Sequence, residues 1–347
     1  MTSASMRSPS FVGSGTIQFI DKVMPEPGPG QLVIQIKANA LCGSERGQFY
    51  QGSTITPGHE AVGTVISAGA GTSTPIGTPG VIFLMDYCGE CRSCRGGWTN
   101  QCLAKRADMG FSHDGGYGPF ELIHENIFFP LGPGADDPAS QWDWAEVTML
   151  LDIMGTGGHA LERARLTRPD SENLLITGAG PIGLGVLAMA KITYGAQFPI
   201  AITDVSPYRL RLAEQLGGIP VNVALTDLKT GLSDYGLTSV DCAIDTSGKG
   251  AARQMAMEVV GKRGGLVCVG HGEGLTLEVS RDLIAPEHTV IGSEYFRYNE
   301  LAHNLELFHA YRGYLSQIIT HRMPVADIQA AFTLFFAGAT GKVVVEQ

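Results

Sequence analysis

The sequence predicts an α/β protein with two domains, a β-barrel with irregular loops followed by a doubly wound parallel sheet. In the first 150 residues, short β-like runs such as 32–38 and 61–68 are punctuated by Gly and Pro, and helical signals are scarce. From residue 173 onward, apolar runs alternate with longer amphipathic stretches, as in βαβ units on a parallel sheet. The length of 347 residues also exceeds what one core usually holds.

The charge and the apolar pattern of the chain argue against two kinds of partner, nucleic acids and membranes. The formal net charge of -10 argues against a nucleic-acid partner, because such proteins usually carry a basic face. No run reaches the roughly 18 consecutive apolar residues that a membrane helix needs, so no membrane partner is expected. The opening residues lack a secretion signal with an apolar segment and cleavage site, and a cytoplasmic location is therefore expected.

Four cysteines occupy one short segment of the N-terminal half with the spacing C-x2-C-x2-C-x7-C. Four thiolates at such spacing can close a tetrahedral zinc site without a further ligand. The alternative is a disulfide cluster, which is disfavoured in a reducing compartment. We therefore expect a structural zinc bound by Cys88, Cys91, Cys94 and Cys102.

A glycine motif marks the cofactor site in the second half. Residues 173–177 form an apolar run that leads into G-x-G-x-x-G, and residues 184–194 then favour a helix. The glycines permit a tight turn, a close approach of pyrophosphate to the backbone, and close packing of helix on strand, while the helix N-terminus faces the phosphates. The dinucleotide-binding residues predicted here are Gly178, Gly180, Pro181, Ile182 and Gly183.

An acidic residue after the next predicted strand strengthens this interpretation. Asp204 ends the run 199–204, where a carboxylate can bind the adenosine ribose hydroxyls and repel a 2′-phosphate, which favours NAD over NADP. Arg209, one helical turn later, complicates that choice. Alternatively, Asp204 is the N-cap of a helix that begins near Pro207.

Two further strands are predicted at 240–245 and 265–270. Ligands bind at the carboxyl ends of strands in an open parallel sheet. We therefore assign to the nicotinamide side Thr246, Val269 and Gly270. Cys242 and Cys268 fall within the apolar strands and are interpreted as core residues.

A four-cysteine lobe ahead of an NAD-type unit resembles the zinc-dependent medium-chain dehydrogenase/reductase family, the class of alcohol and sorbitol dehydrogenases. The likeness covers nearly the whole chain. Its further motifs are Cys42-Gly-Ser-Glu45, Gly58-His-Glu60 with Gly63, Gly115-Gly116 and Lys342-Val-Val-Val345.

The resemblance implies a domain order. A GroES-like catalytic domain is expected over 1–155, with the zinc lobe at 88–102. A Rossmann NAD-binding domain is expected over 156–294, and a return to the catalytic domain over 295–347.

The resemblance also implies a second, catalytic zinc, making two Zn²⁺ ions per chain. Its ligands would be Cys42 and His59, with Glu60 and Asp152 as carboxylates. Asp152 stands where sorbitol-type relatives have a glutamate, and it is one methylene shorter. A catalytic zinc needs about three protein ligands and one open position.

Ser44 matches the family's hydroxyl that bonds the substrate oxygen and passes its proton outward. Many relatives complete this relay with a histidine where this chain has Gly47. Water, the cofactor ribose or His113 remain as alternatives.

Substrate residues are suggested by position. Arg297 lies in a Phe-Arg-Tyr segment like that of sorbitol-type enzymes, and an arginine suits a polyhydroxylated or anionic substrate. The alternative is an ion pair at the domain junction. Proximity to the motifs adds Tyr50 and His113 as candidates.

The function implied is hydride transfer from a secondary alcohol, such as a polyol, sugar or cyclitol, to NAD, giving a ketone. Threonine-type and glucose-type dehydrogenases are alternatives within the family, and a non-catalytic NAD-binding protein with a vestigial zinc site is one of another class. A homodimer or homotetramer is expected, built by pairing the sheet edge near 289–292.

Overall fold

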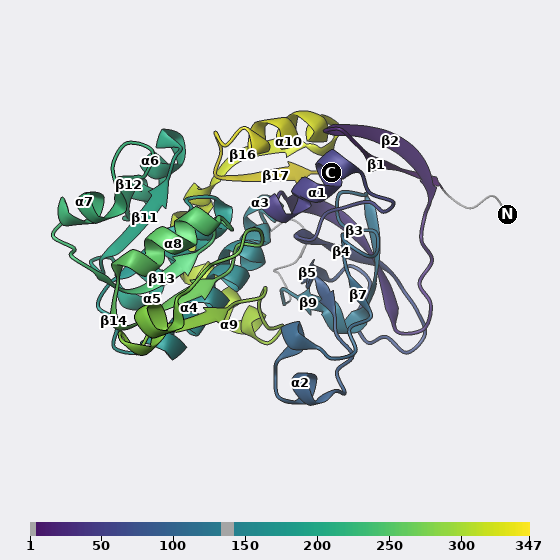
Figure 1. Cartoon of the computed structure of the whole chain (residues 1–347). Coiled ribbons are helices and arrows are strands. Elements are labelled where there is room, and N and C mark those ends of the chain that lie inside the picture. The colour runs from purple at the N-terminus through teal and green to yellow at the C-terminus, as the bar shows by residue number, and fades with distance from the viewer. Residues whose placement is uncertain (1–4, 133–141) are drawn as a thin grey trace.

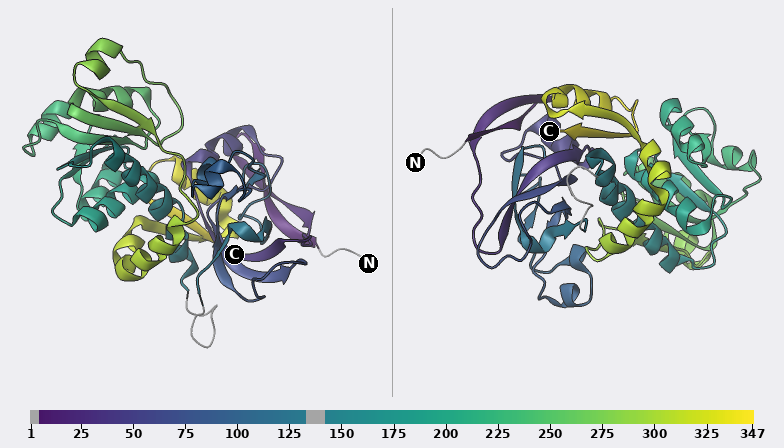
Figure 2. Two further views of the ribbon diagram at one scale, coloured as in Figure 1. Left: turned by 90° about the horizontal axis from the view of Figure 1, so that it is seen from below. Right: turned by 180° about the vertical axis from the view of Figure 1, so that it is seen from behind.

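The computed structural model describes residues 5–132 and 142–347. Figure 1 shows a β-rich body, in purple and blue, beside a parallel sheet covered by helices, in teal and green. The C-terminal elements, in yellow, return to the β-rich body, and the views from below and behind show the same arrangement (Figure 2). No helix in the described ranges is both long enough and apolar enough to cross a bilayer.

The β-rich body is built on a seven-stranded sheet in the order β16-β17-β3-β4-β5-β9, with β8 also paired to β3. Its strands are β3 Gln31–Ala40, β4 Ala61–Ala68, β5 Pro79–Ile82, β8 Phe120–His124, β9 Phe128–Pro130, β16 Ile319–Pro324 and β17 Lys342–Glu346. Two smaller sheets pair β1 Ser5–Gly13 with β2 Thr16–Val23, and β6 Met85–Asp86 with β7 Ala107–Asp108. The short helices here are α1 Arg46–Gln51, α2 Arg92–Arg95 and α3 Trp144–Val147.

The last strand of the chain completes this sheet. β17 runs antiparallel to β3, with Val344 opposite Ala40. Both strands are apolar and largely buried, so the C-terminal segment that begins after the cofactor sheet shares one core with the N-terminal strands. This pairing places Lys342, the first residue of β17, next to Glu60, which directly precedes β4.

The cofactor sheet has six parallel strands in the order β12-β11-β10-β13-β14-β15. In chain order this is 3-2-1-4-5-6, the doubly wound arrangement whose topological switch point lies between its first and fourth strands, here β10 and β13. The strands are β10 Leu174–Thr177, β11 Ile200–Asp204, β12 Ile219–Asn222, β13 Val240–Asp245, β14 Val260–Cys268 and β15 Thr289–Gly292. The accompanying helices are α4 Gly157–Thr167, α5 Pro181–Tyr194, α6 Pro207–Gln215, α7 Leu228–Ser233, α8 Gly250–Val259, α9 Glu300–Leu315 and α10 Ile328–Phe336, the last of which packs on the β-rich body.

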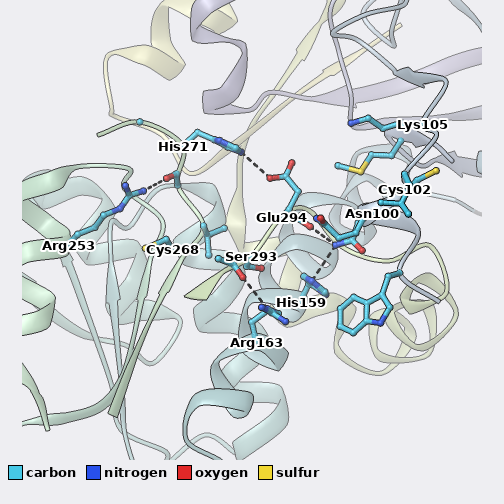
Figure 3. Close-up of a pocket in the computed structure, with 18 residues that line it drawn as sticks. Asn100, Cys102, Lys105, His159, Arg163, Arg253, Cys268, His271, Ser293 and Glu294 are labelled. Atoms are coloured by element: carbon cyan, nitrogen blue, oxygen red, sulfur yellow. Dashed lines mark hydrogen bonds and ion pairs between the residues drawn. The ribbon is translucent and has the colours of Figure 1, made fainter. Parts of the chain in front are cut away.

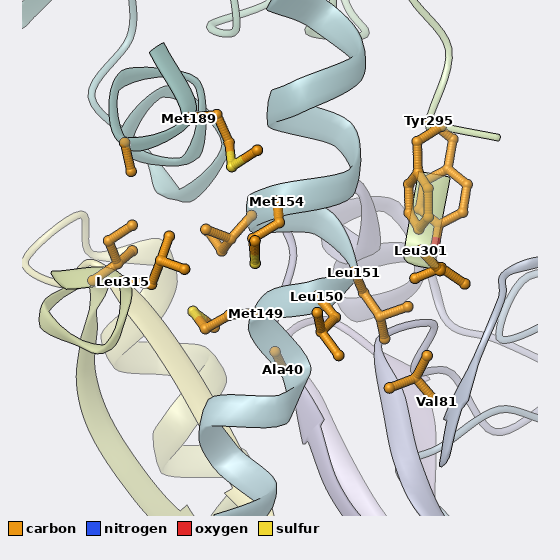
Figure 4. Close-up of a cluster of buried hydrophobic side chains, with 14 of the residues drawn as sticks. Ala40, Val81, Met149, Leu150, Leu151, Met154, Met189, Tyr295, Leu301 and Leu315 are labelled. Carbon is orange, nitrogen blue, oxygen red and sulfur yellow. The ribbon is translucent and has the colours of Figure 1, made fainter. Parts of the chain in front are cut away.

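One apolar core joins the two bodies through the segment that connects them. The 3-10 turn Thr148–Leu150 and the π-turn Asp152–Thr156 place Met149, Leu151 and Met154 fully inside. Figure 4 shows these side chains among others from β3, β5, α5 and α9. The segment is thus held from both sides, which fixes the position of Asp152.

Candidate active site and metal centres

The four cysteines of the lobe around α2 face one another at distances suited to one metal ion. The Sγ atoms of Cys88 and Cys102 and those of Cys91 and Cys94 are 3.5 Å apart, and those of Cys88 and Cys94 are 4.0 Å apart. Tetrahedral bonds of about 2.3 Å imply sulfur separations of about 3.8 Å, whereas a disulfide needs about 2.05 Å. All four thiols are free, so the geometry contradicts the disulfide alternative and fits zinc.

Backbone amides donate hydrogen bonds to one of these sulfurs, that of Cys91. The amide of Cys94 donates to the sulfur of Cys91 at 3.5 Å, and that of Leu103 donates to it at 3.4 Å. These bonds favour the thiolate and lower the pKa of Cys91 to about 6. Thiolate is the form that binds metal.

A second group of metal-binding side chains is buried where the two bodies meet. The ligand atoms of Cys42, His59, Glu60 and Asp152 all lie within 4.8 Å of one another. Cys42 follows β3, His59 and Glu60 directly precede β4, and Asp152 begins the π-turn. Distant segments therefore form the quartet that the family resemblance implies.

His59 is held in place through its Nδ1 atom. Nδ1 lies 3.0 Å from Oε1 of Glu45, whose Oε2 accepts bonds from the Tyr117 hydroxyl at 2.6 Å and from the Cys42 amide at 3.2 Å. Nε2 instead faces Asp152, 3.7 Å from Oδ2. A carboxylate behind a histidine fixes the ring and its tautomer, leaving Nε2 for a metal.

The two carboxylates of the quartet have different partners. Glu60 forms a fully buried ion pair with Lys342 through Oε1, while its Oε2 has no hydrogen-bond partner. Oδ1 of Asp152 accepts a bond from the Thr156 hydroxyl at 3.1 Å. Each carboxylate thus keeps an oxygen available to a cation.

Burial and mutual charge shift the pKa values of these groups. Burial, together with Asp152 nearby, raises the pKa of Cys42 and, well above its usual value, that of Glu60. Burial lowers the pKa of His59, but hydrogen bonds with Asp152, Cys42 and Glu45 outweigh it and raise the value well above normal. One buried lysine, Lys342, faces two carboxylates and a thiol, so a bound divalent cation would balance the charge of the group. The residues present therefore fit a catalytic zinc.

The glycine loop has the shape of a dinucleotide site. Gly178 has φ +94°, and a Cβ on Gly183 would lie 1.9 Å from the Gly178 carbonyl oxygen, so both positions require glycine. Pro181 and Ile182 open α5, with Gly180 as its N-cap residue. The amide groups at the start of α5 face the loop, as a pyrophosphate site requires.

Asp204 is tied to this loop. Its Oδ2 accepts from the Ala179 amide at 2.8 Å, and its Oδ1 accepts from the amides of Val205 and Ser206 at 2.8 Å. The N-cap of α6 is Ser206, whose hydroxyl accepts from the Arg209 amide, so the interpretation of Asp204 as that cap is wrong. Nε of Arg209 donates to the Thr340 carbonyl at 3.2 Å.

The predicted nicotinamide residues lie at the carboxyl ends of β13 and β14. The Thr246 hydroxyl bonds to the carbonyls of Thr177 and Gly178 at 3.0 Å each. The amides of Val269 and Gly270 donate to the Asp245 carbonyl at 2.8 and 2.9 Å. Cys242 is buried and Cys268 half-buried in their strands, as interpreted from the sequence.

A buried ion pair next to these loops, between Arg253 and Asp245, was not predicted from the sequence. Nε of Arg253, on α8, lies 2.7 Å from Oδ2 of the buried Asp245, and its other nitrogens bond to the carbonyls of Gly270 and Glu273. Arg253 is 8% exposed. It therefore ties the end of β13 to the loop after β14.

The substrate candidates lie in different surroundings. Arg297 bonds to Glu162 and Glu300 and stacks 4.8 Å from the Trp98 ring, so its contacts are those of the ion-pair alternative. Tyr50 is exposed and packs on Phe336.

Two further predicted residues are exposed: Ser44, which is close in sequence to Cys42, and His113, which is close in sequence to a ring that packs near His59. Ser44 is exposed two residues after Cys42. His113 is exposed and contacts Ser112, close to Phe111, whose ring centroid is 5.0 Å from that of His59.

Three contacts of the quartet were missed from the sequence, those of Glu45, Tyr117 and Lys342. Glu45 and Lys342 stand in motifs that carry the family resemblance, but motif membership does not say what a side chain touches. Lys342 and Glu60 are 282 positions apart. Tyr117 directly follows the Gly115-Gly116 motif, which was the available signal.

Comparisons with known proteins agree with this architecture. A family model described as alcohol dehydrogenase GroES-like domain matches residues 28–133, and one described as zinc-binding dehydrogenase matches residues 181–310. An L-threonine 3-dehydrogenase of Francisella tularensis is 30% identical over 94% of each chain. An uncharacterized zinc-type alcohol dehydrogenase-like protein of Escherichia coli is 28% identical over 96% of each.

A solved structure shows the same fold. A short chain alcohol dehydrogenase of Escherichia coli complexed with NADH superposes with a TM-score of 0.85, at 19% identity over 99% of this chain and 100% of that one.

Proposed function

This chain belongs to the zinc-dependent medium-chain alcohol dehydrogenase family of oxidoreductases, and we propose that it oxidises a secondary alcohol to a ketone, with NAD accepting the hydride. The observation that carries the proposal is the buried quartet of Cys42, His59, Glu60 and Asp152. A vestigial site would have lost part of this donor set. Zinc bound there would act as a Lewis acid that lowers the pKa of the alcohol.

The chain's own residues then have separable roles. Cys42 and Asp152 supply anionic donors, and Glu45 orients His59 so that Nε2 faces the metal position. Lys342 forms a buried ion pair with Glu60 and offsets part of the cost of burying its carboxylate. We assign Ser44 to receive the alcohol proton, because it is exposed beside Cys42.

NAD is the proposed cofactor. Asp204 stands at the end of β11, where a carboxylate meets the adenosine ribose and repels a 2′-phosphate. Its link to the Ala179 amide orients it toward the glycine loop.

The substrate class proposed is a small molecule with a secondary hydroxyl next to further polar groups, as in polyols, sugars and cyclitols. An amino alcohol is the second candidate, favoured by the similarity to L-threonine 3-dehydrogenase. Absorbance of NADH at neutral pH over a panel of all four classes tests both. No reduction of NAD by any compound, with the protein zinc-loaded and folded, would contradict the proposal.

We propose a homodimer or homotetramer that works in the cytoplasm. β15 is an edge strand of the cofactor sheet, with a partner on one side only among the described strands. Pairing two β15 strands would cover that edge. Molar mass from light scattering tests the assembly.

A further inference from the structure

A polar cavity of about 990 Å³ lies between the zinc lobe and the edge of the cofactor sheet. Most of its lining comes from the lobe after α2, one face of α4, and the loops after β14 and β15, while Met85 and Arg253 complete it (Figure 3). Its polar lining includes Asn100, Lys105, His159, Arg163, Ser293 and Glu294.

The cavity adjoins the nicotinamide side of the proposed chemistry. Val269 and Gly270, at the proposed nicotinamide side, line it. Glu294 also lines it, and the next residue, Tyr295, is buried with a hydroxyl that has no hydrogen-bond partner.

The charge of the cavity is opposite to that of the protein. The chain carries a net charge of -10, yet the cavity is lined by Lys105, Arg163 and Arg253 and by one carboxylate, that of Glu294. Arg253 is bound to Asp245.

The remaining charged groups of the cavity leave one cation without an acidic partner. Lys105 pairs with Asp108 at 2.7 Å, and Glu294 lies 3.5 Å from His271. Nε of Arg163 donates to the Gly292 carbonyl at 3.1 Å, and no carboxylate of the described residues lies within 4.0 Å of its guanidinium. Its terminal nitrogens are therefore free to bind an anion, which they can do bidentately.

Two buried polar atoms at the cavity also lack partners. These are Oδ1 of Asn100, a residue 5% exposed, and Oγ of Ser293, a residue 9% exposed. The orientation of the Asn100 amide follows from its neighbours: Nδ2 donates to the Glu294 carbonyl at 2.7 Å and faces Nε2 of His159 at 3.5 Å.

The tautomer of His159 supports this orientation. Its Nδ1 is 3.0 Å from the Glu300 carboxylate and so carries the proton, which leaves Nε2 as an acceptor. Both hydrogens of the Asn100 amide are then used, and Oδ1 is left to accept from a ligand. A buried acceptor without a donor costs free energy, so a ligand that brings one is favoured.

We propose that this cavity binds the carboxylate end of an anionic hydroxylated substrate, with Arg163 holding the carboxylate and Asn100 and Ser293 bonding to its hydroxyl or ammonium groups. The inference deepens the proposed function and rests on it. It selects small hydroxy acids, such as sugar acids and β-hydroxy amino acids, over neutral polyols and simple alcohols.

Kinetics with matched substrate pairs test the inference. The pairs are D-gluconate with sorbitol, and L-threonine with threoninol. In each pair the neutral counterpart carries an uncharged hydroxymethyl group in place of the carboxylate, and the ammonium group is common to both members of the second pair. The variant is Arg163→Gln, and the control is Arg165→Gln, an exposed arginine on the same helix that does not line this cavity. Melting temperatures of both variants establish that the fold is retained.

The expected result is a lower KM for at least one acid than for its neutral counterpart. Arg163→Gln should raise the KM for that acid about 10- to 100-fold, the effect of losing a charge-assisted hydrogen bond. The KM for the neutral partner and the kcat should stay within about twofold, and Arg165→Gln should match the wild type. Ser293→Ala should produce a smaller rise in the same KM. Equal effects of the two arginine variants, or a preference for the neutral member of both pairs, would overturn the inference.

Calorimetry of D-gluconate binding to the zinc-loaded protein separates the two proposals. Binding that Arg163→Gln weakens supports the anion site even where no alcohol is oxidised, an outcome that defeats the proposed function alone. Gluconate that speeds the oxidation of a neutral alcohol would show a separate effector, and it would overturn the assignment of the carboxylate to the substrate.

Discussion

Arg253→Met should destabilise the cofactor domain more than any exposed ion pair does. The guanidinium lies 2.7 Å from the fully buried Asp245 carboxylate, and it also bonds to the carbonyls of Gly270 and Glu273. Methionine fills much of the same volume but leaves Oδ2 of Asp245 with only the long contact from the Gly248 amide at 3.3 Å. Removal of one partner of a buried pair costs about 3–5 kcal/mol.

The structure also sets where within that range the loss should fall. Oδ1 of Asp245 keeps its bonds from the hydroxyls of Thr177 at 2.7 Å and Ser247 at 2.6 Å. One carboxylate oxygen therefore stays satisfied, and we expect a loss near the lower limit, about 3 kcal/mol. Because the loop after β14 loses two tethers, the KM for NAD should rise as well.

Urea denaturation followed by circular dichroism measures the loss in the free energy of unfolding. Lys249→Met is the control, since Lys249 pairs with Glu273 on the surface, with side-chain exposures of 67% and 57%, and should cost at most about 1 kcal/mol. Adding Asp245→Asn to Arg253→Met removes the unpaired charge and should recover part of the loss. If Arg253→Met costs no more than Lys249→Met, or if the double variant is as unstable as the sum of the single ones, Arg253 does not stabilise the protein through the buried charge of Asp245.

Three further predictions concern the metal lobe, the cofactor and pH. Cys94→Ser should reduce folded yield and thermal stability before it affects kcat, because the Cys94 thiol is one of the four proposed ligands of the structural zinc. An unchanged melting temperature would contradict a structural zinc. Asp204→Ala should raise the KM for NAD and weaken discrimination against NADP, which steady-state kinetics with both cofactors would reveal, since the ribose loses its carboxylate. Glu121 is buried with neither oxygen hydrogen-bonded, and burial raises its pKa well above the usual value. Glu121 therefore favours the folded state below the unfolded-state pKa, and the wild type loses stability as pH rises toward the folded-state pKa. Relative to the wild type, Glu121→Gln should become more stable by about 1.4 kcal/mol per pH unit above about pH 4.3. An equal dependence of the two free energies of unfolding on pH, measured by urea denaturation, would argue against this prediction.

Motifs predicted much of the site where the residues that act together lie close in the sequence. The spacing of Cys88, Cys91, Cys94 and Cys102 predicts a metal site, and the glycine loop requires its glycines because a Cβ atom would not fit there. Four of the six strands of the cofactor sheet were indicated by apolar runs, and the strand order obeys the doubly wound rule.

What the sequence did not reveal depends on contacts between distant segments. The burial of Lys342 against Glu60 follows from the pairing of β17 with β3, which no spacing predicts. Asp204 was open to interpretation as a helix cap because a carboxylate before a helix serves either purpose, and only the position of Ser206 decides. Arg297 likewise offers five donors to any partner, and its partners became visible only when α4 and α9 were placed beside it.

A catalytic zinc at the quartet can be tested by measuring zinc content per chain with plasma mass spectrometry, on the wild type and on Cys42→Ser, and by assaying NAD reduction on the same samples. We expect two zinc ions in the wild type, and one in Cys42→Ser with the fold retained and alcohol oxidation abolished. One zinc in both proteins, or full activity in the variant, would contradict a catalytic metal at the quartet of Cys42, His59, Glu60 and Asp152.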